Sequence, residues 1–133
     1  MKTFDLDIVT PDRLFFSEKV EMIIVRGLEG DLAVLKGRTP LTTPLKIGQV
    51  RVFQDGKERL AAVVNGYISV LGNKTTIVTE CAEWPEEIDV ERAEEARKRA
   101  EEILKRNDPD VDFIRAEAAL KRAINRLKTA KHY

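Results

Sequence analysis

The chain has 133 residues, 43% of them hydrophobic, and its 23 basic side chains equal its 23 acidic ones. This length allows one compact domain with an appendage. A formal charge of zero gives no overall field to attract nucleic acid or an anionic membrane, so neither is an expected partner. No stretch approaches the roughly 18 to 20 apolar residues of a membrane span, and no secretory signal precedes the first strand-like segment. We therefore expect a cytoplasmic protein without direct membrane insertion.

Cys81 and His132 are the only cysteine and histidine in the sequence. A single cysteine excludes an internal disulfide, and its position at the end of a strand-like segment predicts a small buried side chain. One histidine near the terminus does not provide a set of metal ligands, so no metal site is expected.

Residues 2–83 show the period of two that is typical of short β-strands. Val20, Met22 and Ile24 are expected to share one face of a strand. Asp55-Gly56 and residues 72–74 predict tight turns. The resulting hairpins join residues 50–52 to 59–64 and residues 66–71 to 75–80. Repeated short strands separated by glycine and proline predict an antiparallel β-sandwich or flattened barrel over residues 1–84.

After Trp84-Pro85 the glycines end, alanine and charge increase, and the hydrophobic period becomes helical. Small and apolar residues then recur every three or four positions, which predicts two amphipathic helices over residues 85–133. The predicted seam between them is Ala93, Ala96, Ala100, Ile103, Phe113, Ala116, Leu120, Ala123, Leu127 and Ala130. Residues 107–110 break the pattern, with Asp108 as the expected N-cap and Pro109 at the first helical position. So short a break predicts an antiparallel hairpin, which makes the chain an α+β protein in two parts.

Alanine dominates the predicted seam, and a buried methyl group contributes far less free energy than a leucine side chain. Helices of this length are marginal by themselves in water, so we expect the hairpin to open or extend at modest cost. The alternative is a permanently docked hairpin with a thin core.

Four arginines converge on one flank of the predicted hairpin: Arg92, Arg99, Arg122 and Arg126. Arg92, Arg99 and Arg126 occupy heptad position g, and g positions face one another in an antiparallel pair. The other flank is predicted to pair Val90 with Ile124 and Arg97 with Glu117. Four like charges require an anion, and the planar arginine fork suits a polyphosphate. Because the sequence has no P-loop, we expect binding without hydrolysis.

The carboxyl end of the chain is basic, with no acidic residue after Glu117. Lys121, Arg122, Arg126 and Lys128 fall in this segment and would suit an acidic protein surface. Nucleic acid is not the expected partner, because no aromatic residues are interleaved with the basic ones.

Three segments resemble a known family. The hexamer Ile88-Asp89-Val90-Glu91-Arg92-Ala93, with the four arginines and Glu83, is similar to the nucleotide-binding pattern of the epsilon subunit of bacterial F-type ATP synthases. Residues 30–41 and 65–70 resemble two segments of the β-domain of that family. The resemblance covers essentially the whole chain.

The resemblance implies a non-catalytic central-stalk subunit that couples rotor parts and inhibits ATP hydrolysis through a mobile hairpin. The implied partners are the gamma subunit, the ring of c subunits, and the alpha and beta subunits, at the cytoplasmic face of the bacterial plasma membrane. ATP would be a regulatory ligand, with its magnesium requirement left open.

The resemblance also assigns roles to residues. Those on the adenine and ribose side would be Glu83, Ile88, Asp89 and Ala93; those on the phosphates would be Arg92, Arg99, Arg122 and Arg126. The rotor interface would include Asp31, Arg38, Thr39 and Pro40. The inhibitory contact with beta would use Lys121, Arg122, Arg126 and Lys128.

Two other functions compete with this one. The first is a purely structural coupling subunit, with a permanently folded hairpin and no physiological nucleotide. The second is an independent β-sandwich enzyme, which is disfavoured because one cysteine and one histidine do not complete a catalytic set.

Overall fold

Buried and partly exposed residues alternate along the first strand, β1 (Phe4–Val9), in which Phe4, Leu6 and Ile8 are buried. The computed structural model describes residues 2–106 and 108–131, so Asn107 and His132 lie outside the described residues. The chain divides into two units, Met1–Glu83 and Trp84–Tyr133. The other strands of the first unit are β2 (Leu14–Val20), β3 (Met22–Gly27), β4 (Gly30–Leu35), β5 (Leu41–Leu45), β6 (Gly48–Gln54), β7 (Lys57–Val64), β8 (Gly66–Leu71), β9 (Lys74–Val78) and β10 (Cys81–Glu83).

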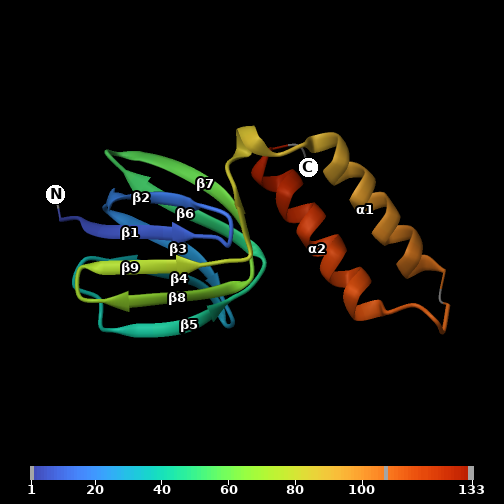
Figure 1. Ribbon diagram of the computed structural model, residues 1–133, viewed down its shortest axis with the longest axis horizontal. Helices are drawn as coiled ribbons and strands as arrows, with labels where there is room; N and C mark the ends of the chain where they lie inside the picture. Colours follow the sequence, from blue (N-terminus) through green and yellow to red (C-terminus); the bar gives the residue numbers. More distant parts are fainter. Residues whose placement is uncertain (1, 107, 132–133) are drawn as a thin grey trace. The chain divides into compact units, whose positions relative to one another are not determined.

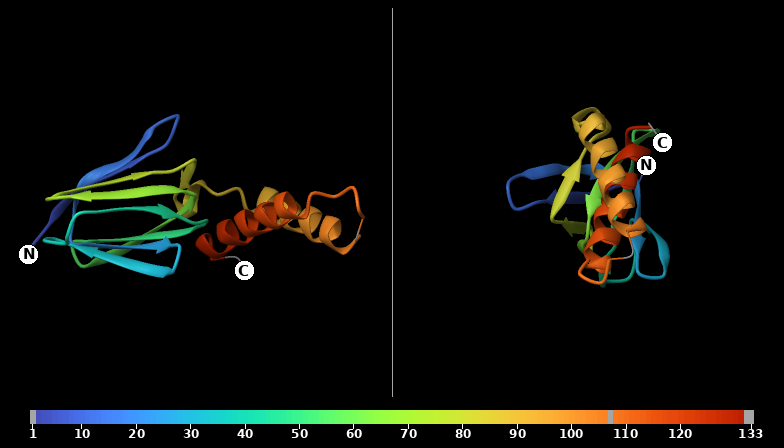
Figure 2. Two further views of the ribbon diagram at one scale, coloured as in Figure 1. Left: turned by 90° about the horizontal axis from the view of Figure 1, so that it is seen from below. Right: turned by 90° about the vertical axis from the view of Figure 1, so that its right-hand side faces the viewer.

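The strands form one continuous path, β10-β7-β6-β3-β5-β8-β9-β1-β2, with β4 paired to β3. Figures 1 and 2 show that this path folds over into two layers. A single paired position, Gly27 with Leu45, connects β3 to β5 and thus joins the two halves. The predicted antiparallel β-sandwich is confirmed. Among the described strands the one exception to antiparallel pairing is β1 with β9.

Two predictions within the sandwich are wrong. Val20, Met22 and Ile24 do not share a strand face, because β2 ends at Val20 and the alternation restarts after a bend at Glu21. The buried residues of β3 are Ile23, Val25 and Gly27 instead. Cys81 is exposed rather than buried.

The exposure of Cys81 follows from its place in the sheet. It begins β10, which pairs only with β7 and forms the end of the strand path. The buried residue of that short strand is the next one, Ala82.

The predicted turn at Asp55-Gly56 is confirmed and joins β6 to β7. Both residues have positive φ, 53° and 73°, as a two-residue hairpin turn of type I′ requires. Gly66, at the start of β8, has φ +113°, and a Cβ added there would lie 1.9 Å from the carbonyl oxygen of Val78. Glycine is therefore required at position 66 both for its backbone angle and for the close approach of β9.

The second unit contains a short 3-10 helix, η1 (Pro85–Glu87), and two α-helices, α1 (Val90–Lys105) and α2 (Phe113–Thr129). The α-helices pack against each other and run antiparallel (Figures 1 and 2), which confirms the predicted hairpin. No helix in the described part of the chain is long and apolar enough to cross a membrane.

The N-cap of α2 is Asp112, not Asp108 as predicted. The Asp112 carboxylate accepts a hydrogen bond from the Arg115 backbone N–H at 3.1 Å. The Asp108 carboxylate instead accepts from the Asp110 N–H at 2.9 Å and stabilises the turn before the helix. Pro109 lies in this turn rather than at the first helical position.

The seam between the helices consists mainly of small side chains. Its buried members are Ala93, Ala100, Ala116, Ala123 and Leu127. The other predicted members, Ala96, Ile103, Leu120 and Ala130, are half-buried. Phe113 is 39% exposed, contrary to the prediction, because it begins α2 beside the turn.

We expect Gly66→Ala to lower the free energy of unfolding of the β-sandwich by about 3 kcal/mol or more, because it combines an unfavourable backbone angle with a steric clash. The matched control is Gly72→Ala, where φ is +61° but an added Cβ meets nothing within 4 Å. It should cost about 1 kcal/mol. Urea unfolding followed by circular dichroism measures both, and equal losses would contradict the steric argument.

Candidate functional site

The four predicted site arginines have the same position relative to the helical seam. Each directly precedes a seam residue that is buried: Arg92 precedes Ala93, Arg99 precedes Ala100, Arg122 precedes Ala123, and Arg126 precedes Leu127. A residue that directly precedes a seam residue is rotated from it by about 100° around the helix axis, in the same sense on both helices. Because the helices are antiparallel, equal rotations bring these side chains to the same flank of the hairpin. We call this surface, defined by Arg92, Arg99, Arg122 and Arg126, the arginine flank.

The levels of the arginines along the hairpin follow from the helix ends. Arg92 lies thirteen residues before Lys105, the last residue of α1, and Arg126 lies thirteen residues after Phe113, the first of α2. At 1.5 Å per residue both lie about 20 Å from the turn. Arg99 and Arg122 lie about 9 and 14 Å from the turn by the same count. The four guanidinium groups are thus distributed over about 10 Å of one flank.

The arginine flank faces solvent along most of its length. Arg92, Arg99 and Arg122 are exposed and Arg126 is half-buried. The side chains of Arg92, Arg99 and Arg122 have no ion pair with another described residue. Their positive charges are therefore available to an anion in solution.

Arg115 also belongs to this flank. Arg115 directly precedes the buried Ala116 and lies seven residues before Arg122, so it has the same orientation on α2. The sequence contained a signal for it, because the dipeptide Arg-Ala occurs at 92, 99, 115 and 122.

Most of the residues predicted for the nucleoside side do not share the exposed position of the arginine flank. Asp89 is the N-cap of α1, and its carboxylate accepts the Arg92 backbone N–H at 3.1 Å. Ile88 and Ala93 are buried, at 8% and 0% exposure. Glu83 is half-buried at the end of β10 and belongs to the first unit. The structure thus places Asp89, Ile88 and Ala93 beside Arg92 along the chain and assigns Glu83 to the β-sandwich.

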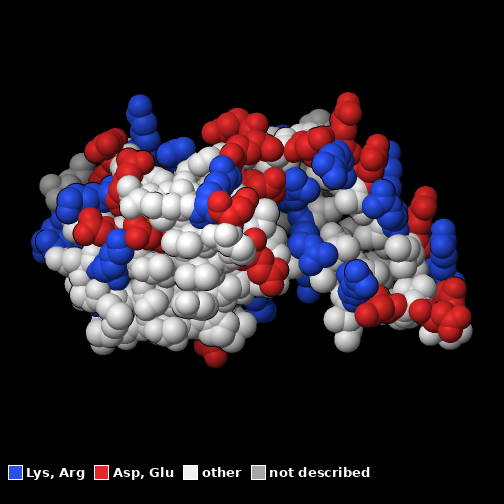
Figure 3. Space-filling view, in the orientation of Figure 1, with Lys and Arg blue, Asp and Glu red and all other residues white. Residues whose placement is uncertain are grey.

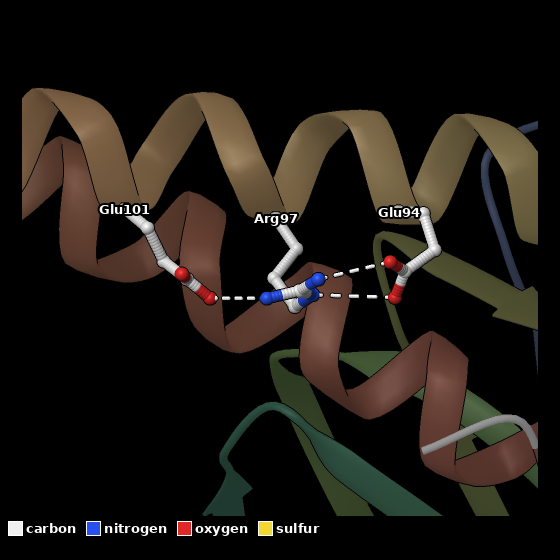
Figure 4. Close-up of polar contacts among 3 residues, drawn as sticks. All are labelled: Glu94, Arg97 and Glu101. Atoms are coloured by element: carbon white, nitrogen blue, oxygen red, sulfur yellow. Dashed lines mark hydrogen bonds and ion pairs between the residues drawn. The ribbon is translucent and has the colours of Figure 1, made fainter.

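The opposite flank of α1 carries an ion-pair network, shown in Figure 4. The Arg97 guanidinium donates to both carboxylate oxygens of Glu94, at 3.2 and 2.9 Å, and to Glu101 at 2.6 Å. The predicted pairing of Arg97 with Glu117 is therefore wrong. Glutamates three positions before and four after reach Arg97 within its own helix, at less conformational cost than a partner on α2. Hydrogen bonding to Glu94, and then to Glu101, raises the pKa of Arg97 further above its already basic value.

The basic residues predicted for an inhibitory contact all lie on α2. Lys121, Arg122 and Lys128 are exposed and Arg126 is half-buried. In Figure 3 basic side chains dominate much of α2, whereas basic and acidic side chains alternate over α1. Lys121 and Lys128 project away from the arginine flank, since they lie one position before it or two after it on the helix. Arg122 and Arg126 are common to both predicted sites.

The predicted rotor residues lie in or near the β3–β4 and β4–β5 connections. Asp31 is exposed in β4 and forms an ion pair with Arg26 at 3.2 Å. Arg38, Thr39 and Pro40 are exposed between β4 and β5. Asp31 and Arg38 line one cavity of about 530 Å³, together with Gly27, Leu28, Glu29, Gly30, Leu32, Leu41 and Thr43.

Leu28 is a surface feature that the sequence reasoning missed. It is 55% exposed at the turn between β3 and β4 and lines the same cavity. Its signal in the sequence was a large apolar residue within the turn segment Gly27-Leu28-Glu29-Gly30, where a polar residue is usual. Leu28 thus adds an apolar side chain to the polar surface formed by Asp31 and Arg38.

Two sequence families match the two units. Residues 3–85 match the family described as "ATP synthase, Delta/Epsilon chain, beta-sandwich domain", and residues 86–131 match "ATP synthase, Delta/Epsilon chain, long alpha-helix domain". The ATP synthase epsilon chain of Bacillus licheniformis is 49% identical over 98% of this chain and 100% of its own length. That of Caldicellulosiruptor saccharolyticus is 45% identical over 96% of this chain and 93% of its own.

A solved structure agrees with these sequences. A chain in the cryo-EM structure of the Euglena gracilis mitochondrial ATP synthase, OSCP/F1/c-ring in rotational state 1, superposes with a TM-score of 0.85 at 27% identity. The match covers 99% of this chain and 83% of that one. Fold and sequence together define a subunit of an ATP synthase. The chain belongs to the ATP synthase delta/epsilon chain family, and the two relatives named above are epsilon chains.

We expect Arg97→Gln to lower the melting temperature of the helical hairpin by about 2 to 4 °C at low salt, because Glu94 and Glu101 lose their shared partner. High salt should reduce the difference, since screening weakens partly exposed ion pairs. Thermal unfolding followed by the helical circular dichroism signal measures the effect. Lys98→Gln is the matched control at an exposed position of the same helix, and an equal loss in both variants would contradict a specific network.

Proposed function

We propose that this epsilon chain is a central-stalk subunit of a proton-translocating F-type ATP synthase that binds ATP without hydrolysing it and restrains hydrolysis by the whole complex. The observation that carries the proposal is the arginine flank, where four arginines from two helices lie along one side of the hairpin. The subunit itself acts as a non-catalytic regulator, peripheral to the membrane at its cytoplasmic face.

Nucleotide is the ligand that best fits the arginine flank. Planar guanidinium groups donate paired hydrogen bonds to phosphate oxygens and stay charged at every physiological pH. Their spread of about 10 Å along the hairpin suits several phosphates in a row better than a single one. The family resemblance assigns Asp89, Ile88, Ala93 and Glu83 to the nucleoside side of the site; of these, Asp89 is exposed beside Arg92 and would contact the nucleoside directly.

ATP would also change the stability of the hairpin. A ligand that binds only the closed hairpin stabilises it by RT ln(1 + [L]/Kd), which is about 2.7 kcal/mol at a hundredfold excess over Kd. A seam built mainly of alanine holds the helices together weakly, so a contribution of this size would decide whether they stay paired. The hairpin would respond to ATP by closing, and to its loss by extending.

Inhibition would use the basic surface of α2 against the catalytic head of alpha and beta subunits. Lys121, Arg122, Arg126 and Lys128 provide the positive charge for acidic residues of beta. Because Arg122 and Arg126 belong both to this surface and to the arginine flank, one guanidinium group cannot serve ATP and beta together. Bound ATP would therefore relieve inhibition by competition for the same two side chains.

The gamma subunit and the c ring are the proposed rotor partners of the β-sandwich. The support is the exposed surface of Asp31, Arg38, Thr39, Pro40 and Leu28, with its cavity. The similarity to a chain from an assembly described as containing F1 and the c-ring also favours these partners.

We expect Arg92→Ala and Arg126→Ala each to weaken binding of ATP to the isolated chain at least tenfold, because each removes a charge-assisted contact to phosphate. Isothermal titration calorimetry measures the affinity. The matched control, Lys98→Ala, removes an exposed basic side chain from the face of α1 that points away from the seam and should change the affinity less than twofold. Absence of wild-type binding at millimolar ATP would refute the nucleotide site.

We expect a chain truncated before Ile88 to assemble into the ATP synthase complex while ATP hydrolysis rises, because the β-sandwich keeps its rotor contacts and the basic arm is lost. Steady-state hydrolysis by the reconstituted complex is the measurement. A complex in which Lys121 and Lys128 are replaced by glutamine should show a partial rise. If truncation leaves hydrolysis unchanged, the subunit serves only in structural coupling.

A further inference from the structure

Two arginines of α1 each lie between two glutamates in the sequence but have different partners in the structure. Arg97 has glutamates three positions before it and four positions after it. Arg99 has Glu95 four positions before it and Glu102 three positions after it. Both spacings bring a carboxylate within reach of the guanidinium group on one helix face.

Of these two triads, Glu94-Arg97-Glu101 and Glu95-Arg99-Glu102, only the first forms ion pairs. Arg97 forms ion pairs with Glu94 and Glu101 at 2.9 and 2.6 Å, and these side chains are partly buried. Arg99, Glu95 and Glu102 are exposed, and no ion pair joins them to one another or to other described residues. The glutamates of the second triad therefore lie at the surface without a basic partner among the described residues.

Glu95 and Glu102 lie on the same side of α1 as the arginine flank. Each directly precedes a half-buried seam residue, Ala96 or Ile103, as Arg92 and Arg99 precede buried ones. Glu94 and Glu101 directly follow buried seam residues, Ala93 and Ala100, so they lie on the opposite side. Both pairs consist of two glutamates seven residues apart on α1, but the two pairs lie on opposite flanks of the helix.

We propose that Glu95 and Glu102 set the affinity of the arginine flank for nucleotide phosphates, which rests on the function proposed above. They act in two ways, and both weaken the binding of phosphate. They repel the phosphates across about one helical turn, and they compete with phosphate for the Arg99 guanidinium. Glu95 is the stronger competitor, because a glutamate four residues before a basic residue has the favourable orientation along a helix.

The ion-pair network of Arg97 completes this arrangement. It pairs Glu94 and Glu101 with a positive charge and holds them on the flank that faces away from the arginine flank, so they contribute less at the nucleotide than Glu95 and Glu102 do. The affinity for ATP is thus lowered selectively by the two glutamates that stand beside Arg99. A chain with this pattern responds to ATP at higher concentrations than one with neutral residues at 95 and 102.

The test is calorimetric titration of the full chain with ATP in the presence of EDTA, comparing the wild type with Glu95→Gln/Glu102→Gln and with Glu94→Gln/Glu101→Gln. The first double variant should bind ATP about tenfold more tightly at low ionic strength, as expected for removing two nearby like charges in a solvent-exposed setting. The difference should shrink at about 0.5 M salt, where the Debye length is only a few ångströms. The second double variant, with the same change in net charge, should bind within twofold of the wild type.

The inference has defined outcomes that would overturn it. Unchanged or weaker binding by Glu95→Gln/Glu102→Gln would do so, as would an equal gain in both double variants, which would reflect net charge alone. If the wild type binds ATP but this first variant binds no better, only the present inference fails. If neither the wild type nor any variant binds, the proposed nucleotide site fails with it; binding gained only by Glu95→Gln/Glu102→Gln would support both. Circular dichroism of each variant verifies that its helices are intact.

Discussion

Small side chains at the seam between α1 and α2 are the constraint on which the behaviour of the helical unit depends. Ala93, Ala100, Ala116 and Ala123 are buried there, and each methyl group contributes about 1 kcal/mol or less. Alanine lets the two helices approach closely, which brings arginines of both helices to one flank. The same choice leaves little apolar free energy to offset the repulsion among those arginines. The small alanine side chains thus explain both why the arginines lie close together and why the two helices pack weakly.

The two flanks of α1 differ in whether their charged side chains form ion pairs within the helix. On one side Arg97 is satisfied by Glu94 and Glu101 and stabilises the helix by itself. On the other side Arg92 and Arg99 face solvent without an ion pair to another described residue, with Glu95 and Glu102 beside them. Local pairing therefore maintains α1 whether or not the hairpin is closed. Under the proposed function, closure itself depends on an anion supplied from outside the chain.

The sequence predicted those features that depend on a single strong local signal. The type I′ turn at Asp55-Gly56 and the alanine seam of the hairpin are confirmed, because positive φ and a 3-4 spacing each permit few alternatives. Prediction failed where two local solutions compete. Asp108 and Asp112 both precede α2, and only the geometry of the turn decides which one caps it. Arg97 had partners available within α1 and across the seam, and spacing alone does not rank them.

Longer-range effects account for the remaining errors. The alternation in β3 restarts after the bend at Glu21, so its buried face shifted by one residue. Cys81 is exposed because β10 lies at the end of the strand path, a position that sequence spacing does not reveal. Leu28 was missed because its role as an exposed cavity residue emerges only when the β3–β4 turn stands beside Arg38.

Amide hydrogen exchange of the isolated chain, with and without ATP, tests most directly the central claim that a weak seam is closed by a ligand on the arginine flank. The account predicts that saturating ATP slows exchange in α1 and α2 together, by about a hundredfold at a hundredfold excess over Kd, while the β-sandwich strands exchange at unchanged rates. ATP binding that leaves exchange in both helices unaltered would contradict it, because the hairpin would then be closed by its own packing.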